Sequence, residues 1–199
     1  MKTQKLQTLL ALIACSSLTA HAAVILGPIT NPSNGHSYLL LATSSWTDAE
    51  AEAISLGGHL ATVRSSAENQ WIIDTFTLSG SQNRRLWIGL NDAAIEGTFV
   101  WTSGEPVSFT YWASGEPNSL GNEDYTEIVQ PVFNPNFPLL VPGSWNDSTG
   151  AAIDGNQPTI PYHGVVEIVP EPTTAGLLLF GLTTILIRRS RKPNERNVA

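Results

Sequence analysis

Cysteine is almost absent from this chain of 199 residues, which holds a single one, Cys15. Cys15 lies in an N-terminal segment that we expect to be removed, so the mature protein would have no disulfide, although its compartment would permit one. The body of the chain must then be stabilised by packing alone. Residues 24–168 are long enough for one domain that buries roughly two thirds of its surface without such cross-links.

Basic side chains are also scarce in the body of the chain. Between residues 24 and 168 only Arg64, Arg84 and Arg85 are basic, against fifteen Asp and Glu, which gives a net charge of −12. Such a surface repels nucleic acid, whose binding depends on Lys and Arg. It also destabilises the compact state by self-repulsion unless cations compensate. We therefore expect no nucleic-acid partner and favour a cation-binding protein.

Catalytic patterns are missing as well. His36, His59 and His163 are scattered, without a nucleophile or a metal-ligand spacing around them. Glu123 and Asp124 could in principle act as general acid and base. Neighbouring strand positions would point these two side chains to opposite faces of a sheet, which argues against a shared substrate. We expect that the protein is not an enzyme.

The N-terminus has the pattern of a secretory signal peptide over residues 1–22. Lys2 and Lys5 precede an apolar run, and Ala20-His21-Ala22 supplies a small-x-small cleavage site. Leu12-Ile13-Ala14-Cys15 resembles a bacterial lipobox, which leaves open the alternative that Cys15 carries a lipid.

The C-terminus holds a second candidate processing signal over residues 169–192. A helix over the apolar run from Thr173 to Ile187 would measure about 22 Å, short of a bilayer core of about 30 Å. The basic cluster after it, with residues 193–199, would lie on the cytoplasmic side. With Pro170-Glu171-Pro172 in front, the segment resembles the PEP-CTERM sorting signal of Gram-negative bacteria. This implies an exosortase that recognises Pro170, Glu171 and Pro172 and removes the tail.

An ordinary C-terminal membrane anchor is the alternative for this tail. Either way, we expect the body of the protein to be exported to the cell envelope, the outer surface or the medium, with a transient or permanent membrane anchor.

The body between these ends begins with helices and continues with strands. Ser45 and Ser65 each precede an acidic residue by three positions, which predicts two capped helices that end at Gly57-Gly58 and at Gly80. Short strands are expected at 38–42, 86–90, 99–101, 109–112, 125–129 and 165–168. This order favours an α+β fold with a mostly antiparallel sheet.

Oxygen-bearing side chains gather in two separate segments of the second half. They are Glu116 and Asn118 around Pro117, then Glu123, and finally Asn146 and Asp147. Oxygen-only ligand sets suit Ca²⁺, which takes 6–8 oxygens at about 2.3–2.6 Å. If the fold brings the two segments together, the chain has a calcium site.

Read in order, several motifs resemble a C-type lectin-like domain. They are Trp46-Thr47-Asp48-Ala49, Gly57-Gly58-His59-Leu60-Ala61-Thr62-Val63, Glu68-Asn69-Gln70-Trp71, Leu86-Trp87-Ile88-Gly89-Leu90 and Trp145-Asn146-Asp147. The match runs from about Gly35 to Ile168. It implies a domain over residues 24–168 with two helices, short mostly antiparallel strands and a long calcium-binding loop region.

The resemblance also implies which residues bind calcium and sugar. In sugar-binding members the corresponding motifs form the principal calcium site, with a cis-proline at the position of Pro117. Carried over, the calcium and carbohydrate ligands are Glu116, Asn118, Glu123, Asn146 and Asp147. An auxiliary calcium site would use Asp92, Glu96, Glu123 and Asp124, with Ser119 in place of a family Asp. The alternative, that Asp92 and Glu96 are ordinary polar loop residues, stays open.

The chain departs from the family where two common disulfides are expected. Ala53 and Val166 replace one pair, and Tyr125 and Gly150 replace the other. Small or apolar replacements indicate a disulfide-free variant that is held by packing. The segment 129–144 is longer than in compact members and would lie near the calcium loop.

In the family, the order Glu-Pro-Asn accompanies equatorial 3- and 4-hydroxyls. The resemblance therefore implies mannose- or glucose-type sugars, with an exopolysaccharide as a multivalent partner. The alternative is a structural or protein-binding module that keeps calcium for loop rigidity, because a fold alone does not fix a function. We expect the tryptophans to lie in the core rather than to stack on sugar.

Overall fold

The computed structural model describes residues 23–77, 84–129, 141–153 and 160–170. Its helices are α1 (Trp46–Ser55) and α2 (Ser66–Phe76). Its strands are β1 (Val24–Thr30), β2 (Ser37–Thr43), β3 (His59–Leu60), β4 (Arg85–Asn91), β5 (Val100–Trp101), β6 (Tyr125–Ile128), β7 (Trp145–Ser148) and β8 (Tyr162–Ile168).

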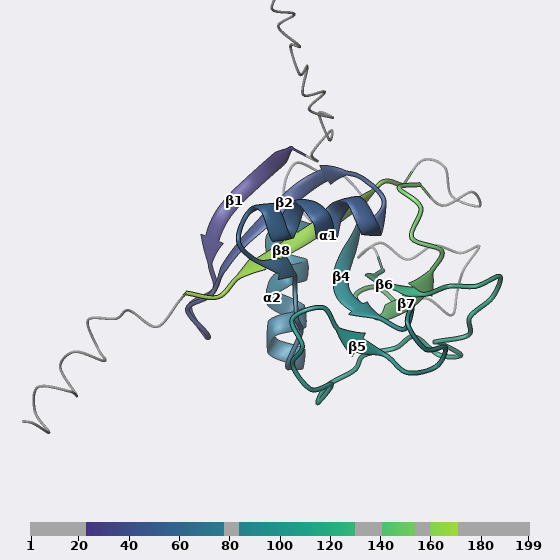
Figure 1. Cartoon of the computed structure of the whole chain (residues 1–199). Coiled ribbons are helices and arrows are strands. Elements are labelled where there is room, and N and C mark those ends of the chain that lie inside the picture. Colours follow the sequence, from purple (N-terminus) through teal and green to yellow (C-terminus); the bar gives the residue numbers. More distant parts are fainter. Residues whose placement is uncertain (1–22, 78–83, 130–140, 154–159, 171–199) are drawn as a thin grey trace, which may run out of the picture.

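All the described strands join one sheet in the order β1-β2-β8-β4-β6-β7. β3 pairs with β8, and β5 pairs with β4. Only β4 and β8 run parallel; the other described pairs are antiparallel. The predicted α+β class with a mostly antiparallel sheet is confirmed, and Figure 1 shows both helices beside the β2–β8 part of the sheet.

Alternation along β2 explains why the two helices lie on opposite faces of the sheet. Tyr38 and Leu40 belong to the core cluster that contains the apolar side chains of α2. Leu39 and Leu41 belong to the cluster that contains those of α1. Because successive strand side chains point to opposite faces, each helix covers one face.

Serine caps start both helices where the sequence predicts them. The Ser45 hydroxyl accepts a hydrogen bond from the Asp48 N–H, and the Ser65 hydroxyl accepts one from the Glu68 N–H. The first helix ends at Ser55, just before the predicted glycine stop. The second ends at Phe76 rather than at Gly80, which lies outside the described residues. Thr77 caps it, and its hydroxyl donates to the Ile73 carbonyl.

Three strands, β1, the two-residue β3 and β7, escaped the sequence prediction, and one predicted strand is wrong. Gly27-Pro28 interrupts the pattern of β1, and the polar side chains of β7 obscure its strand character. The expected strand at 109–112 forms only an isolated bridge, between Trp112 and Trp145. Its aromatic side chains pack edge-on against Trp145 instead of continuing a ladder.

Packing replaces the two family disulfides, as predicted. Ala53 and Val166 are fully buried in one core cluster. At the second position, a Cβ added to Gly150 would lie 2.5 Å from Cδ2 of Tyr125. The tyrosine ring therefore fills the space beside a residue without a side chain, and it also stacks on Trp46.

The tryptophans mostly lie in the core, as expected. Trp46, Trp87, Trp101 and Trp145 are buried, whereas Trp71 and Trp112 are partly buried and pack against the core. Trp145 also donates its indole N–H to Oδ1 of Asn69.

The predicted ends of the chain remain predictions. The signal peptide at 1–22 and the tail beyond Pro170 lie outside the described residues. Within the part of the chain that the structure describes, no helix is long and apolar enough to cross a membrane.

Candidate functional site

Backbone hydrogen bonds bring the two oxygen-rich segments side by side. Trp145 N donates to Tyr111 O, and Ala113 N donates to Trp145 O at 2.8 Å. The loop that carries Glu116 and Asn118 therefore leaves from the edge of β7. β7 itself carries Asn146 and Asp147, so the fold meets the first requirement for the predicted calcium site.

Asp147 is the buried centre of this loop region. Its side chain is fully buried and accepts three hydrogen bonds from the opposite segment. Asn118 N donates to both carboxylate oxygens, at 3.2 and 3.0 Å, and Ser119 N donates to Oδ2 at 2.7 Å. The Asp147 carboxylate thus holds the backbone after Pro117, and the Glu116–Pro117 peptide bond is cis.

Glu116 faces Asp147 in a strongly acidic environment. Its Oε2 is buried and has no hydrogen-bond partner among the described residues. Burial, a hydrogen bond with Asp147 and the charges of Asp147 and Glu123 raise the pKa of Glu116 to about 7. Two carboxyl groups this close cannot both ionise without a compensating positive charge. A proton or a metal ion must supply that charge.

Asn146 points away from this pair. Its Nδ2 donates to Oε1 of Glu127 at 3.1 Å and also contacts the Asp147 carbonyl oxygen. Asn146 and Glu127 lie directly opposite each other on β7 and β6. Because successive side chains of a strand point to opposite faces, the side chains of Asn146 and Asp147 leave β7 on different faces.

Of the five predicted ligands, the structure brings three carboxylates and one amide residue into one neighbourhood. Glu116 and Asp147 share a hydrogen bond, Asn118 contacts Asp147 through its backbone, and Glu123 lies near enough to act on the pKa of Glu116. Asn146 joins this group only through its neighbour Asp147. Among the described residues, no three His, Cys, Asp or Glu side chains are already arranged to hold a metal ion.

The donor set nevertheless fits calcium. Every predicted ligand offers oxygen, which hard cations prefer. Oε2 of Glu116, which is buried and has no hydrogen-bond partner among the described residues, could be satisfied by a cation. When bound, calcium would be held by Glu116, Asn118, Glu123 and Asp147, with Asn146 at the edge of the set.

The predicted auxiliary site shows the same signs around Asp92. Its carboxylate is buried, Oδ2 accepts from Gly97 N at 2.8 Å, and Oδ1 has no hydrogen-bond partner in the described structure. Burial, together with the charges of Glu96 and Asp124, raises the pKa of Asp92. These features fit a calcium ligand and also a structural residue of the loop, so both interpretations of Asp92 stay open. Whether it binds calcium stays a prediction.

Glu123 and Asp124 do not lie on a strand, which corrects one premise of the sequence analysis. β6 begins only at Tyr125. The carboxylate of Asp124 accepts from Nδ2 of Asn122 in its own loop, and its backbone carbonyl accepts from Asp92 N in the loop after β4.

Sequence reasoning missed the buried ion pair behind the site. Arg85 on β4 donates from Nη1 to Oε1 of Glu127 on β6 and to the Tyr162 hydroxyl. Both members of the pair are almost completely buried. Burial raises the pKa of Glu127, and Arg85 and Asn146 oppose this. The available signals were a glutamate inside the predicted strand at 125–129 and an arginine directly before the predicted strand at 86–90.

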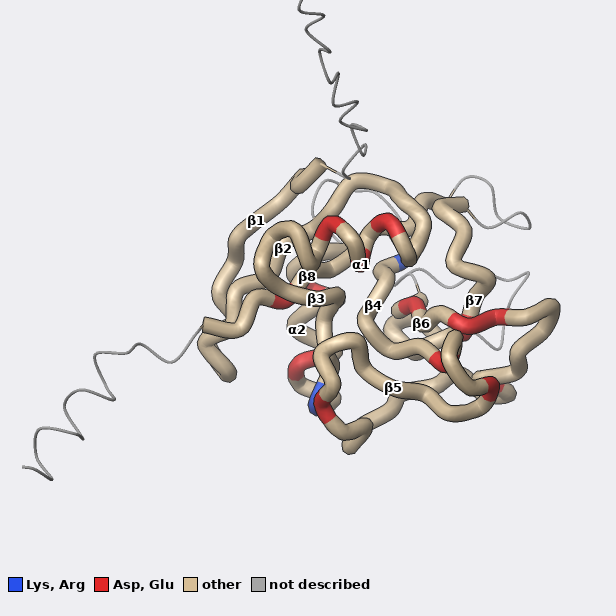
Figure 2. Tube along the Cα trace, viewed as in Figure 1, with Lys and Arg blue, Asp and Glu red and all other residues tan. Residues whose placement is uncertain are grey.

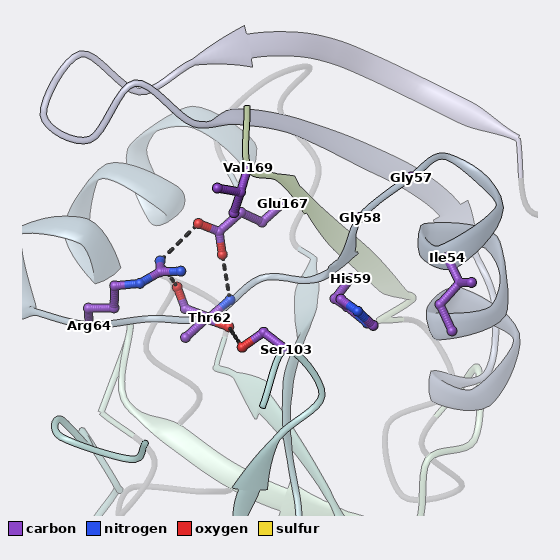
Figure 3. Close-up of a pocket in the computed structure, with 9 residues that line it drawn as sticks. All are labelled: Ile54, Gly57, Gly58, His59, Thr62, Arg64, Ser103, Glu167 and Val169. Carbon is purple, nitrogen blue, oxygen red and sulfur yellow. Dashed lines mark hydrogen bonds and ion pairs between the residues drawn. The ribbon is translucent and has the colours of Figure 1, made fainter. Parts of the chain in front are cut away.

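A cavity of about 360 Å³, not lined by any of the predicted calcium ligands, lies between α1, β3 and the end of β8. Figure 3 shows Arg64 and Glu167 in its wall. Glu167 accepts from Arg64 Nη1 at 2.8 Å and from Thr62 N at 2.9 Å. The carboxylate of Glu167 is therefore paired with Arg64 within the wall.

Comparison with known proteins decides the family. The model of the family described as "Lectin C-type domain" matches residues 42–149, which is more than half of the chain. This chain belongs to the C-type lectin family. The match spans both helices and the Glu116 and Asp147 segments.

Individual C-type lectins resemble the chain over part of its length. Lectin BRA-3 of Megabalanus rosa is 38% identical over 104 residues, which cover 51% of this chain and 56% of that lectin. The alpha-N-acetylgalactosamine-specific lectin of Patiria pectinifera is 39% identical over 97 residues, covering 46% and 58%. The chain thus spans little more than half the length of these two relatives.

A solved C-type lectin shows the same fold. The C-type lectin CEL-I from Cucumaria echinata aligns with a TM-score of 0.54 and 29% identity, covering 68% of this chain and 91% of that one. Membership of this lectin family supports carbohydrate binding. It also agrees with the prediction that the protein is not an enzyme, because the family is non-enzymatic.

Proposed function

We propose that this C-type lectin is exported and binds mannose- or glucose-type sugars through calcium in the loop region. The observation that carries the proposal is the Glu116–Asp147 pair, two hydrogen-bonded carboxyl groups with a buried orphan oxygen between opposing segments. Such a pair needs a proton or a cation between its members, and it lies where the family resemblance expects the calcium ligands.

The chain's own residues supply both hydrogen-bond directions for a sugar. Bound calcium would supply a positive centre that attracts the hydroxyl oxygens of a sugar. Ionised Glu116 only accepts hydrogen bonds, whereas the Asn118 amide can accept and donate. Oδ1 of Asn118 accepts from Leu120 N at 2.8 Å and keeps a second lone pair for calcium, and its NH₂ group is the donor for a sugar hydroxyl.

Sugar preference rests on the order of Glu116 and Asn118, since relatives of different preference match the chain. One of them is named for alpha-N-acetylgalactosamine. The Glu-Pro-Asn order favours equatorial 3- and 4-hydroxyls, so we place this chain with the mannose or glucose type. Repeated sugars of an exopolysaccharide would supply avidity.

A second function is favoured by one specific observation. Backbone N–H groups of Asn118 and Ser119 already satisfy Asp147 without an ion. These hydrogen bonds hold the loop in place, which suits a calcium-stabilised structural or protein-interaction module that binds no sugar.

The location of the protein is part of the proposal. We place it at the cell envelope or outer surface, or in the medium, after export by the signal peptide at 1–22. Recognition of Pro170, Glu171 and Pro172 by an exosortase would end a transient membrane anchorage. Intact-mass measurement of the mature protein tests this, because it reports cleavage near Ala22, a lipid on Cys15 and loss of the tail.

The decisive test of the binding function uses immobilised mannan. We expect the purified protein to be retained in millimolar calcium and released by EDTA, and free methyl α-mannoside to compete. Calcium binding without retention on any mannose- or glucose-type glycan would favour the structural module instead.

A further inference from the structure

The domain offers almost no cationic side chain to a ligand. Arg64, Arg84 and Arg85 are its only basic residues between 24 and 168. Arg64 lies in the cavity of Figure 3, where ion pairs with Glu68, Glu105 and Glu167 surround its guanidinium. Three carboxylates therefore surround a single positive charge, and no net positive charge is left for a ligand.

The other two arginines are turned inward. Arg85 is 2% exposed and paired with the carboxylate of Glu127. Arg84 is 7% exposed, and its Nη1 donates to the Phe76 carbonyl at 3.1 Å. Neither guanidinium is placed to meet a ligand at the surface of the loop region.

The histidines of the domain do not fill this gap. His163 is buried, its Nδ1 bonds the Leu41 carbonyl, and burial lowers its pKa, so it stays neutral. His36 is bonded to Glu167 and His59 to Glu50, both away from the loop region.

The loop region carries the opposite charge in excess. Six carboxyl groups lie on the segments that surround the proposed site, at Asp92, Glu96, Glu116, Glu123, Asp124 and Asp147. Figure 2 shows how few basic positions stand among the acidic ones. Even with two calcium ions bound, these six carboxylates would keep a net charge of about −2.

We infer that the glycan ligand of this lectin is neutral, and that uronic, sialylated, sulfated and phosphorylated sugars are excluded. The inference rests on the proposed function and narrows its ligand class. Carboxylate, sulfate and phosphate groups are recognised by Arg and Lys through charge-assisted hydrogen bonds. This domain has none available, and like charges that are brought together across an interface oppose binding.

A matched pair of sugars tests the inference directly. Methyl α-glucoside and methyl α-glucuronide share their ring hydroxyls and differ by a carboxylate at C6. At low salt, we expect the glucuronide to compete for mannan binding at least about 10-fold less well than the glucoside. High salt screens charge, so we expect the difference to shrink there.

Two substitutions distinguish the effect of a positive charge beside the site from the effect of a change in the net charge of the domain. Leu120 is 77% exposed in the loop between Asn118 and Glu123, and Leu120→Lys places a cation beside the site. We expect this variant to recover most of the glucuronide binding. Ile54 is 57% exposed on α1 at the cavity of Figure 3, and Ile54→Lys should leave the discrimination unchanged.

Equal competition by the two sugars in the wild-type protein would overturn the inference while leaving the lectin function intact. The same recovery in Ile54→Lys and Leu120→Lys would also overturn it, because the effect would then not be local. If the wild-type protein does not bind mannan and neither sugar binds to it, the proposed function itself is overturned, and this inference with it.

Discussion

The carboxylate of Glu127 accepts a hydrogen bond from the side-chain amide of Asn146 at 3.1 Å, directly across β6 and β7. Arg85 holds the same Glu127 oxygen from β4. The NH₂ group of Asn146 is thereby fixed toward Glu127. A buried ion pair thus orients a proposed calcium ligand.

Removing this support should weaken calcium binding. Partners of metal ligands typically contribute 10–100-fold in metal affinity. Glu127→Met alone would leave the buried charge of Arg85 without its carboxylate, which is strongly destabilising, whereas replacing both members of the ion pair by apolar residues is often neutral. We therefore expect the Arg85→Met/Glu127→Met double variant to fold and to bind calcium roughly 10-fold more weakly in isothermal titration.

Asn146→Ala provides the control for this prediction. If Glu127 acts through Asn146, the Arg85 and Glu127 changes should add little further loss in an Asn146→Ala background. Glu68→Met removes another buried, arginine-paired carboxylate far from the loop region. An equal loss of calcium affinity in Glu68→Met would show a general effect of instability.

Calcium affinity should fall as the pH drops below about 7. The pKa of Glu116 is raised from 4.5 to about 7 in the folded protein, so a proton occupies the Glu116–Asp147 pair on the acid side. Calcium must displace that proton. Titrations at pH 8 and pH 6 measure the difference, and Glu116→Gln should show a smaller dependence on pH.

The same shift predicts how the metal-free protein responds to pH. Between the unfolded and folded pKa values the folded state binds more protons, so raising the pH through this window lowers stability. The metal-free protein should therefore melt at a higher temperature near pH 5.5 than near pH 8, before general acid effects set in. Glu116→Gln should flatten part of this slope, and an unchanged slope would contradict the assignment to Glu116.

Exchanging the sugar-directing pair should distinguish a lectin from a scaffold. The Glu116→Gln/Asn118→Asp double variant reverses the order of charge and amide around Pro117. A lectin should shift from mannose-type toward galactose-type competitors. A scaffold should change only in calcium affinity or melting temperature, which differential scanning fluorimetry reports on the same samples.

The contact between Tyr125 and Gly150 should be intolerant of added volume. In Gly150→Ala the new methyl group would lie 2.5 Å from the tyrosine ring, and the backbone has φ +82°. We expect a loss of about 1–3 kcal/mol from overpacking, beyond the backbone strain. Gly104→Ala is the matched control, because Gly104 has φ +78° and no atom within 4 Å of the new Cβ. Similar losses in both variants would exclude a role for Tyr125.

Local signals predicted much of the fold. The cap serines at 45 and 65 set both helix starts, because a hydroxyl that satisfies an N–H of the first turn is a local property. The buried strand around Trp87 was equally evident from its apolar run. β1 was missed because Gly27-Pro28 breaks its pattern, and its pairing with β2 depends on a turn that lies outside the strand itself.

The site was predictable in composition but not in arrangement. Glu116 and Asp147 could be selected as oxygen ligands from motif order. That Asn146 faces Glu127 depends on the register of β6 against β7, in which a shift of one residue would exchange the faces. Register is set by packing across the whole sheet, so no spacing in the sequence reports it.

β1 forms one border of the sheet, and its ladder with β2 is irregular in two places. Pro28 within it has no N–H to offer. An exposed strand of this kind resists joining the border of another molecule. We therefore expect neighbouring copies of this domain to remain separate folded units instead of joining their sheets into fibres.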